Sequence, residues 1–269
     1  MQTVTQGAVL HRAVADGLGF TLTAHEPHRR LDWHTEPVAT LTLQLAGACD
    51  EDISGEVYTC RPGTLLFKPV GAPHRDMFGG DGGQAVIVEL PEVLLAALGR
   101  GPGRKPVATA TNAVTWALGL ELYVAAREGR TGLQERAARL MGRLQANSAA
   151  ELRLARCESW LRDVAEALRG CERGQRRSLA ELSAEAQRHP IYLARAFRRV
   201  YGVSPREYRQ CSRVEQAVPA VAFGEIELVD LALALGFADQ SHLGRVFRRT
   251  VGMTPGRLRR VTRALLASV

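Results

Sequence analysis

Arginines recur at fixed positions in the last third of the sequence. Eight residues between positions 193 and 209 return with the same identity 50 positions later. They are Leu193, Arg195, Phe197, Arg198, Arg199, Gly202, Pro205 and Arg209, which recur as Leu243, Arg245, Phe247, Arg248, Arg249, Gly252, Pro255 and Arg259. Such a repeat indicates two copies of one structural unit. Since a guanidinium can bond a guanine edge or a phosphate, paired contacts with nucleic acid are the chemistry that these residues suggest.

Each copy carries the signals of two short helices joined by a turn. In the first, residues 178–181 fit a capping box that opens a helix, and Pro190 suits the first turn of the next helix. In the second, residues 228–235 have helical spacing, Gly236 supplies a turn and Asp239 is a good N-cap. This order of elements is typical of a helix-turn-helix unit.

The second helix of each copy has two unlike stripes. One stripe is apolar and is expected in the core: Leu193, Ala196, Phe197 and Val200, then Leu243, Val246 and Phe247. The opposite stripe holds Ile191, Ala194, Arg195 and Arg198, then Ser241, Gly244, Arg245 and Arg248. Small residues on this stripe would let a helix backbone lie deep in a groove.

The arginines of these helices have different predicted roles. We predict that Arg195 and Arg245 contact bases, because a bidentate arginine–guanine pair discriminates by roughly 1–3 kcal/mol. The four remaining arginines are expected to contact phosphates or solvent alone: Arg198, Arg199, Arg248 and Arg249.

The net charge of the sequence is concentrated in the same region. Residues 171–269 contain 17 Arg and nine Asp or Glu, whereas residues 1–170 carry a net charge of −1. A basic domain joined to a neutral one favours nucleic acid as the partner of the first. A soluble, arginine-rich helical domain is the alternative that charge alone leaves open.

These segments resemble the AraC/XylS family of regulators. The resemblance lies in the sequences YLARAFRRVYGVSP at 192–205 and GFADQSHLGRVFRR at 236–249, followed by Gly252-Met-Thr-Pro255. It implies a double-stranded DNA partner, with two recognition helices in successive major-groove turns. The base-facing positions that it implies are Ile191, Ala194 and Arg195 in the first helix and Gln240, Ser241, His242 and Arg245 in the second.

The resemblance also implies a function and partners. It implies transcriptional regulation, by default activation, with a small-molecule effector or a protein partner sensed by the N-terminal domain. A homodimer and contact with RNA polymerase are further expectations. Pro219 departs from the family pattern, because the linker between the two units is a continuous helix in the family and a proline there is expected to kink it.

The N-terminal part reads as short strands. Residues 40–45 alternate in polarity, residues 64–67 and 85–88 are apolar runs, and the glycines at 79–83 are expected to form a tight loop. Helical spacing returns at 113–128, 133–144 and 151–168, where we expect a linker or dimer seam.

The expected fold is therefore α+β and multidomain. We predict a cupin-like antiparallel β-barrel sensor at 1–106, a helical linker and dimerisation segment at 107–170, and an all-α domain with two helix-turn-helix units at 171–269. A loop at 99–106 would separate the sensor from the helices.

A short motif in the N-terminal part resembles the second motif of cupin barrels. Gly63, Pro69, Gly71 and His74 have its spacing. We expect a metal-free pocket, lined by Trp33, His34, Tyr58, Phe67, His74 and Arg75. No cofactor and no metal are predicted. A metal site would need His74 to meet two of His25, His28 and His34, a geometry that the sequence neither offers nor excludes.

Other classes of function are less well supported. A cupin-type metal-dependent enzyme with an accessory helical domain is the alternative, but no nucleophile–base pair or cofactor loop is visible. An alkyl-accepting repair protein would need an activated cysteine beside a zinc cluster. The five scattered cysteines are interpreted mainly as buried apolar residues, and the lack of a long apolar run predicts a cytoplasmic protein with no membrane partner.

Overall fold

The computed structural model of the chain describes residues 7–97, 107–109, 113–154, 158–170 and 177–267. Its contacts group into two units, one made of residues 1–144 with 260–269 and the other of residues 145–259. The first unit combines a sheet with helices and the described part of the second is helical, which confirms the predicted α+β class. The predicted loop at 99–106 lies outside the described residues.

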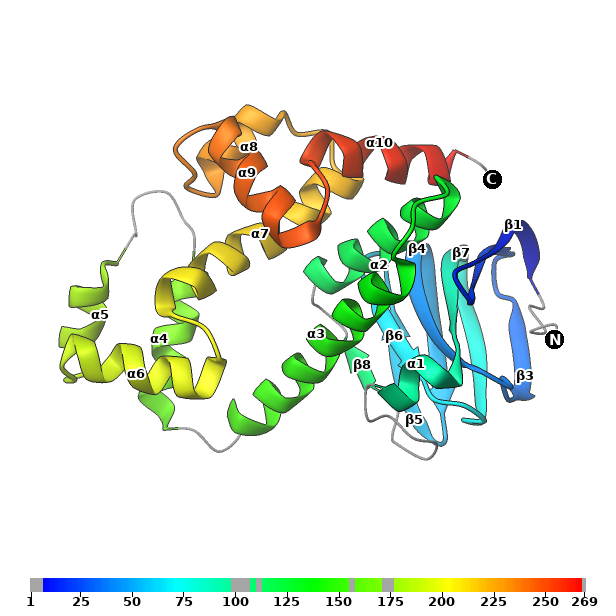
Figure 1. Cartoon of the computed structure of the whole chain (residues 1–269), viewed down its shortest axis with the longest axis horizontal. Coiled ribbons are helices and arrows are strands. Elements are labelled where there is room, and N and C mark those ends of the chain that lie inside the picture. The colour runs from blue at the N-terminus through cyan, green and yellow to red at the C-terminus, as the bar shows by residue number, and fades with distance from the viewer. Residues whose placement is uncertain (1–6, 98–106, 110–112, 155–157, 171–176, 268–269) are drawn as a thin grey trace. The chain divides into compact units, whose positions relative to one another are not determined.

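Eight described strands form one antiparallel sheet (Figure 1). The order is β1 (Ala8–Ala15), β2 (Leu18–His25), β7 (His74–Leu90), β4 (Ala39–Ile53), β6 (Leu65–Lys68) and β8 (Val107–Thr109), with β3 (Arg30–His34) on β7 and β5 (Glu56–Cys60) on β4. The three predicted strands are confirmed within β4, β6 and β7. A short helix, α1 (Glu92–Ala97), follows β7.

Both faces of the central strands are buried, and they differ in polarity. Leu41, Leu43 and Leu45 alternate along β4 with Thr42 and Gln44, and all five are almost fully buried. Because successive side chains of a strand point to opposite faces, the leucines share one face and the polar residues share the other. The sheet therefore has an apolar face and a polar interior.

Helix α2 (Ala113–Arg127) covers the apolar face. The indole nitrogen of Trp116 donates a hydrogen bond of 2.9 Å to the Gln44 carbonyl oxygen. Gly119 lies so close to Leu43 that an added Cβ would clash with it. Residues 113–126 of this helix are all buried, whereas α3 (Leu133–Leu154) has exposed residues among its described side chains.

The glycines at 79–83 do not form the predicted loop. They lie within β7, which runs from His74 to Leu90, but the register partners on β4 pass from Gly47–Gly83 to Cys49–Phe78, so residues 79–82 bulge out of the ladder. Gly47 and Gly82 have φ of +65° and +68°, and a Cβ on Gly47 would clash with the Gly82 carbonyl oxygen. The prediction was wrong because these glycines permit a bulge and a close backbone approach instead of a turn.

The described helices of the second unit are short. They are α4 (Ser159–Arg169), α5 (Leu179–Glu185), α6 (Pro190–Tyr201), α7 (Pro205–Phe223), α8 (Leu228–Ala234) and α9 (Gln240–Val251), followed by α10 (Pro255–Leu266). The predicted helix at 151–168 is helical but is not one helix, since residues 151–154 end α3 and α4 begins at Ser159. Leu161 and Leu168 of α4 pack with Leu193 and Phe197 of α6, so α4 contributes to the core of the first helix-turn-helix unit.

The predicted capping residues act as expected. Ser178 and Glu181 form a reciprocal capping box at α5, and the Asp239 carboxylate accepts a 2.6 Å hydrogen bond from the backbone N–H of His242 at α9. Pro190 occupies the first turn of α6. These bonds satisfy backbone donors that a helix start leaves unpaired.

Helix α7 joins the two helix-turn-helix units as one helix. It extends from Pro205 to Phe223, and Pro219 lies inside it with an exposed side chain. Val214, Ala217, Val218 and Val221 are buried along the helix.

The turns of the two helix-turn-helix units place different residues in the left-handed region. Gln187 has φ of +51° between α5 and α6, whereas Gly236 has φ of +76° between α8 and α9. A side chain in this conformation costs roughly 1–2 kcal/mol.

We expect Gly236→Ala to lower the free energy of unfolding by about 1 kcal/mol. Gln187→Gly should leave the free energy of unfolding equal or raise it, and urea unfolding measures both changes.

Candidate nucleic-acid interface and sheet cavity

Helix α6 presents a continuous exposed face. Ile191 is 59 % exposed, Arg195, Arg198 and Arg199 are exposed, and Ala194 is half-buried. Leu193, Ala196 and Phe197 on the opposite side are buried, as predicted. The helix therefore holds its position through one face and leaves the other free for a partner.

Helix α9 repeats this arrangement. Its exposed residues are Gln240, Ser241, Arg245, Arg248 and Arg249, with His242 and Gly244 half-buried. Leu243, Val246 and Phe247 anchor the helix from the other side, again as predicted. A Cβ added to Gly244 would meet no atom within 4 Å, so the surface beside this backbone is open.

The exposed arginines differ in the hydrogen bonds and ion pairs that they form within the chain. Arg249 donates a 3.2 Å hydrogen bond to the Gln210 side chain, and Arg198 lies 3.9 Å from the Glu207 carboxylate. Within the described part of the chain, Arg195 and Arg245 form no ion pair or side-chain hydrogen bond. These two guanidinium groups are therefore free to bind an external acceptor.

His242 has a structural role that the sequence did not indicate. Its Nδ1 accepts a 3.4 Å hydrogen bond from the Ala238 backbone N–H, and its ring meets the edge of Phe237 with centroids 5.4 Å apart. The imidazole therefore closes the turn before α9. Of its two ring nitrogens, Nε2 is the one that this turn leaves for a base.

Three arginines that sequence reasoning did not place in the site position its helices. Arg259 donates hydrogen bonds to the carbonyl oxygens of Val221 and Ile226, and Arg213 donates one to the Gly236 carbonyl oxygen. Arg209, the counterpart of Arg259 in the first copy, donates to the Arg177 carbonyl oxygen. The identity of Arg209 and Arg259 in the repeat was the signal that could have revealed this shared role.

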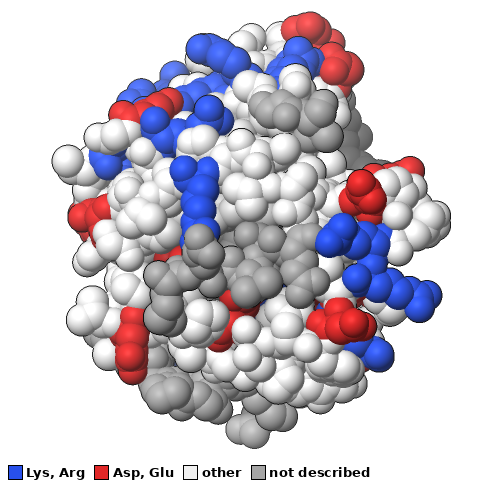
Figure 2. Space-filling view, turned by 90° about the vertical axis from the view of Figure 1, so that its right-hand side faces the viewer, with Lys and Arg blue, Asp and Glu red and all other residues white. Residues whose placement is uncertain are grey.

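The first unit has a different electrostatic character. Residues 1–170 carry a net charge of −1, so basic and acidic groups nearly balance there. On the face of the whole molecule shown in Figure 2, basic and acidic side chains lie among uncharged ones. Several ionisable side chains of the first unit line an internal cavity.

A cavity of about 50 Å³ lies on the polar face of the sheet, bounded by β2, β3, β4, β6 and β7. Its polar lining residues include His25, His34, Glu51, Lys68, His74 and Asp76. Pockets for drug-sized molecules have volumes of about 300–1,000 Å³. The cavity is therefore of a size for an ion or a few waters.

The structure brings together two of the six predicted pocket residues. His34 and His74 line the cavity, with ring centroids 4.1 Å apart. The side chains of Trp33 and Arg75 pack on each other outside it, since the Arg75 guanidinium lies 5.0 Å from the Trp33 ring and 2.9 Å from the Asp52 carboxylate. Tyr58 and Phe67 are not among the lining residues, and neither is His28.

Burial and charge shift the pKa of several lining groups. Burial lowers the pKa of His25 to about 4 and that of His74 to about 3, with Lys68 adding to each shift. Burial and the neighbouring Glu51 raise the pKa of Asp76 to about 6. Burial would lower the pKa of Lys68, but Glu51, at 2.9 Å, and Asp76 raise it above its ordinary value.

Two of the described cysteines lie next to this cavity. Cys49 and Cys60 are buried cross-strand neighbours in β4 and β5. Burial raises the pKa of both thiols well above the ordinary value. They are therefore protonated at neutral pH, which agrees with their interpretation as small apolar residues.

Comparison with known proteins decides the nature of the C-terminal region. Residues 182–261 match the family described as "Helix-turn-helix domain". The virulence regulon transcriptional activator VirF of Yersinia enterocolitica is 36 % identical over 63 residues, which are 23 % of this chain and 23 % of VirF. The regulator ExsA of Pseudomonas aeruginosa is 38 % identical over 63 residues, with the same 23 % of each chain covered.

Residues 182–261 therefore form an AraC-type helix-turn-helix domain. This domain contains α6, α9 and the helix α7 that lies between them in the sequence. The matched segment spans under a quarter of the length of these relatives.

A solved structure also aligns with the chain. The fatty-acid-bound ToxT from Vibrio cholerae aligns over 92 % of this chain and 96 % of its own, with a TM-score of 0.42 and 10 % identity. Among the described residues, none of the helices has the length and continuous apolar character that a bilayer crossing requires.

The lowered pKa of His25 predicts a pH dependence of stability. Because the unfolded histidine titrates near 6.5 and the folded one near 4, its stabilising contribution is present above pH 6.5 and is lost as the pH falls toward 4. Allowing for solvent screening of this partly exposed ring, we expect His25→Gln to lose about 1 kcal/mol less than the wild type on acidification to about pH 5. Denaturant unfolding in the presence of a chelator measures this difference.

The matched control is His28→Asn, because His28 is exposed and has φ of +59°, which asparagine tolerates. Its pH dependence should equal that of the wild type. Equal pH dependence in His25→Gln would contradict the assignment.

Proposed function

We propose that this chain is a sequence-specific DNA-binding regulator of transcription. The observation that supports this most directly is the matched pair of free guanidinium groups, Arg195 and Arg245, on the exposed faces of two repeated helices. Arginine at such a position can bond O6 and N7 of guanine in the major groove. The AraC-type domain and the regulatory names of its relatives support the same function.

The two helices are proposed to read DNA by different chemistry. Ile191 and Ala194 of α6 are apolar and suit contact with thymine methyl groups, whereas Gln240 and Ser241 of α9 can hydrogen-bond to base edges. Arg198, Arg199, Arg248 and Arg249 are proposed to contact phosphates, which adds affinity that depends on salt.

The first unit is proposed to act as a sensor that alters DNA binding. Its buried polar cavity is a site at which an effector could change the relative stability of two conformations. We propose a homodimer with α3 in its interface, action in the cytoplasm beside the chromosome, and activation through RNA polymerase as the direction to test.

Substitution of the two free arginines tests the DNA-binding role. We expect Arg195→Ala and Arg245→Ala each to weaken binding to the preferred site by about 5- to 150-fold and to relax the sequence preference at one segment. The measurement is selection of bound sequences from a genomic-fragment library, followed by titration of the enriched site at fixed salt.

The control for charge is Arg61→Ala, which removes an exposed arginine of the first unit. It should leave the selected sequence unchanged. Equal effects of all three substitutions, or no enriched sequence for the wild type, would overturn the proposed function.

The open surface beside Gly244 allows a steric test. Because a Cβ at this position would have no atom within 4 Å, Gly244→Leu should fold normally, yet its side chain would hold the α9 backbone away from the groove floor. We expect a loss of specific binding of at least about tenfold. The matched control is Gly256→Leu, a helical glycine of α10 with equally open surroundings, and normal DNA binding by Gly244→Leu would place α9 outside the groove.

A further inference from the structure

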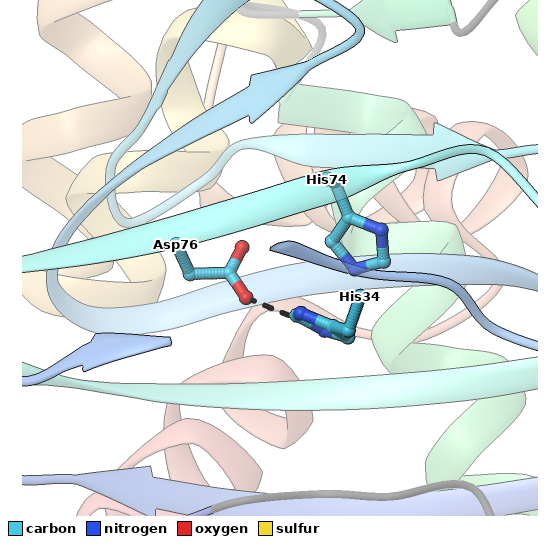
Figure 3. A group of neighbouring side chains, drawn as sticks. All are labelled: His34, His74 and Asp76. Carbon is cyan, nitrogen blue, oxygen red and sulfur yellow. Dashed lines mark ion pairs between the residues drawn. The ribbon is translucent and has the colours of Figure 1, made fainter. Parts of the chain in front are cut away.

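Three side chains that DNA binding does not use converge in the sheet cavity (Figure 3). His34 ends β3, and its register partner across the strand pair is His74, the first residue of β7. Asp76 follows His74 by two residues and therefore points to the same face. One nitrogen of each ring and one carboxylate oxygen all lie within 4.8 Å of one another.

Backbone contacts orient both imidazoles in the same way. Nδ1 of His34 lies 2.8 Å from the Asp32 carbonyl oxygen, and Nδ1 of His74 lies 3.0 Å from the Ala72 carbonyl oxygen. Since a carbonyl oxygen only accepts, Nδ1 carries the proton in each neutral ring and Nε2 keeps its lone pair. Histidines that bind metal ions are commonly held by such a bond from the second nitrogen.

Asp76 has an oxygen that the protein does not satisfy. Its Oδ1 is buried and has no hydrogen-bond partner, while its Oδ2 lies 3.9 Å from Nε2 of His34. A buried carboxylate oxygen without a partner is costly unless a cation or donor reaches it. This atom is therefore the strongest indication of an external ligand.

The charges around the cluster leave a net negative charge that would favour a cation. Glu51, the register partner of Asp76 on β4, is paired with Lys68 at 2.9 Å, so these two charges offset each other. Glu36 adds a further carboxylate to the lining. The negative charge that remains belongs to Asp76 and Glu36, and it faces two imidazoles.

The ligand set and the space available narrow the type of ion. Two imidazoles and a carboxylate suit Zn²⁺ and related transition metals, whereas Mg²⁺ and Ca²⁺ prefer oxygen ligands alone. Zinc binds such atoms at about 2.0–2.2 Å, so movements of roughly 1 Å or less would bring the three atoms onto one ion. A cavity of about 50 Å³ holds that ion with a water or two.

We propose that His34, His74 and Asp76 bind one divalent transition-metal ion, with Zn²⁺ as the best match, through two Nε2 atoms and a carboxylate oxygen. The His34 ring reaches the site from β3 and the other two groups reach it from β7. The ion would therefore link the last residue of β3 to the first residues of β7. This binding is a property of the first unit and stands apart from DNA recognition.

Direct titration of the full chain tests the proposal. After treatment with a chelator and its removal, the protein is titrated with Co²⁺, whose visible absorption reports its ligand geometry, and with Zn²⁺ by calorimetry. We expect one ion of either metal per chain and a Zn²⁺-dependent rise in the thermal midpoint. Loss of a ligand in His34→Gln, His74→Gln or Asp76→Asn should weaken binding by more than about 100-fold.

The control variant is His28→Asn, which changes an exposed histidine that does not line the cavity and should bind as the wild type does. Far-UV circular dichroism establishes that each variant is folded, and the half-buried His34 provides a variant that is readily tolerated. Absence of binding at millimolar Co²⁺ and Zn²⁺, or equal affinity in folded His34→Gln and Asp76→Asn and in the wild type, would overturn the proposal and leave a purely internal imidazole–carboxylate pair.

Discussion

The first unit depends on the alternation of polarity along strands that are buried on both faces. The leucines of β4 pack toward α2, and the intervening Thr42 and Gln44 line the cavity. Apolar burial against α2 supplies the hydrophobic stabilisation that lets the other face carry buried polar groups. Without that helix, the sheet would have to stabilise a charged interior alone.

The buried charge of Lys68 is tolerated because a carboxylate lies beside it. Lys68 stays charged in a fully buried position because Glu51 is in contact with it, and removal of either partner would leave the other uncompensated. The backbone carbonyl oxygens of Asp32 and Ala72 orient the rings of His34 and His74 through their Nδ1 atoms. The sheet thus specifies the positions of polar atoms as tightly as it specifies its apolar core.

Sequence reasoning predicted the helical elements of the AraC-type domain, their caps and their buried stripes, since Ser178, Asp239 and Phe197 act through local or periodic signals. It predicted the α+β class and three strands for the same reason. It misread the glycines at 79–83, because a bulge depends on contact with Gly47 of another strand. Asp76 escaped notice because its meeting with His34 is created by strand register, which no short sequence window contains.

The unlike faces of α6 and α9 have a consequence for the geometry of a bound complex. One helix presents Ile191 and Ala194, and the other presents Gln240 and Ser241, so with the proposed contacts a single chain would read two different segments, and the site of that chain would not be a palindrome. Turning the protein end for end would set each helix against the wrong bases. The base sequence would therefore fix the direction in which each chain lies along the duplex, and a neighbouring protein on the same DNA would always meet the same side of that chain.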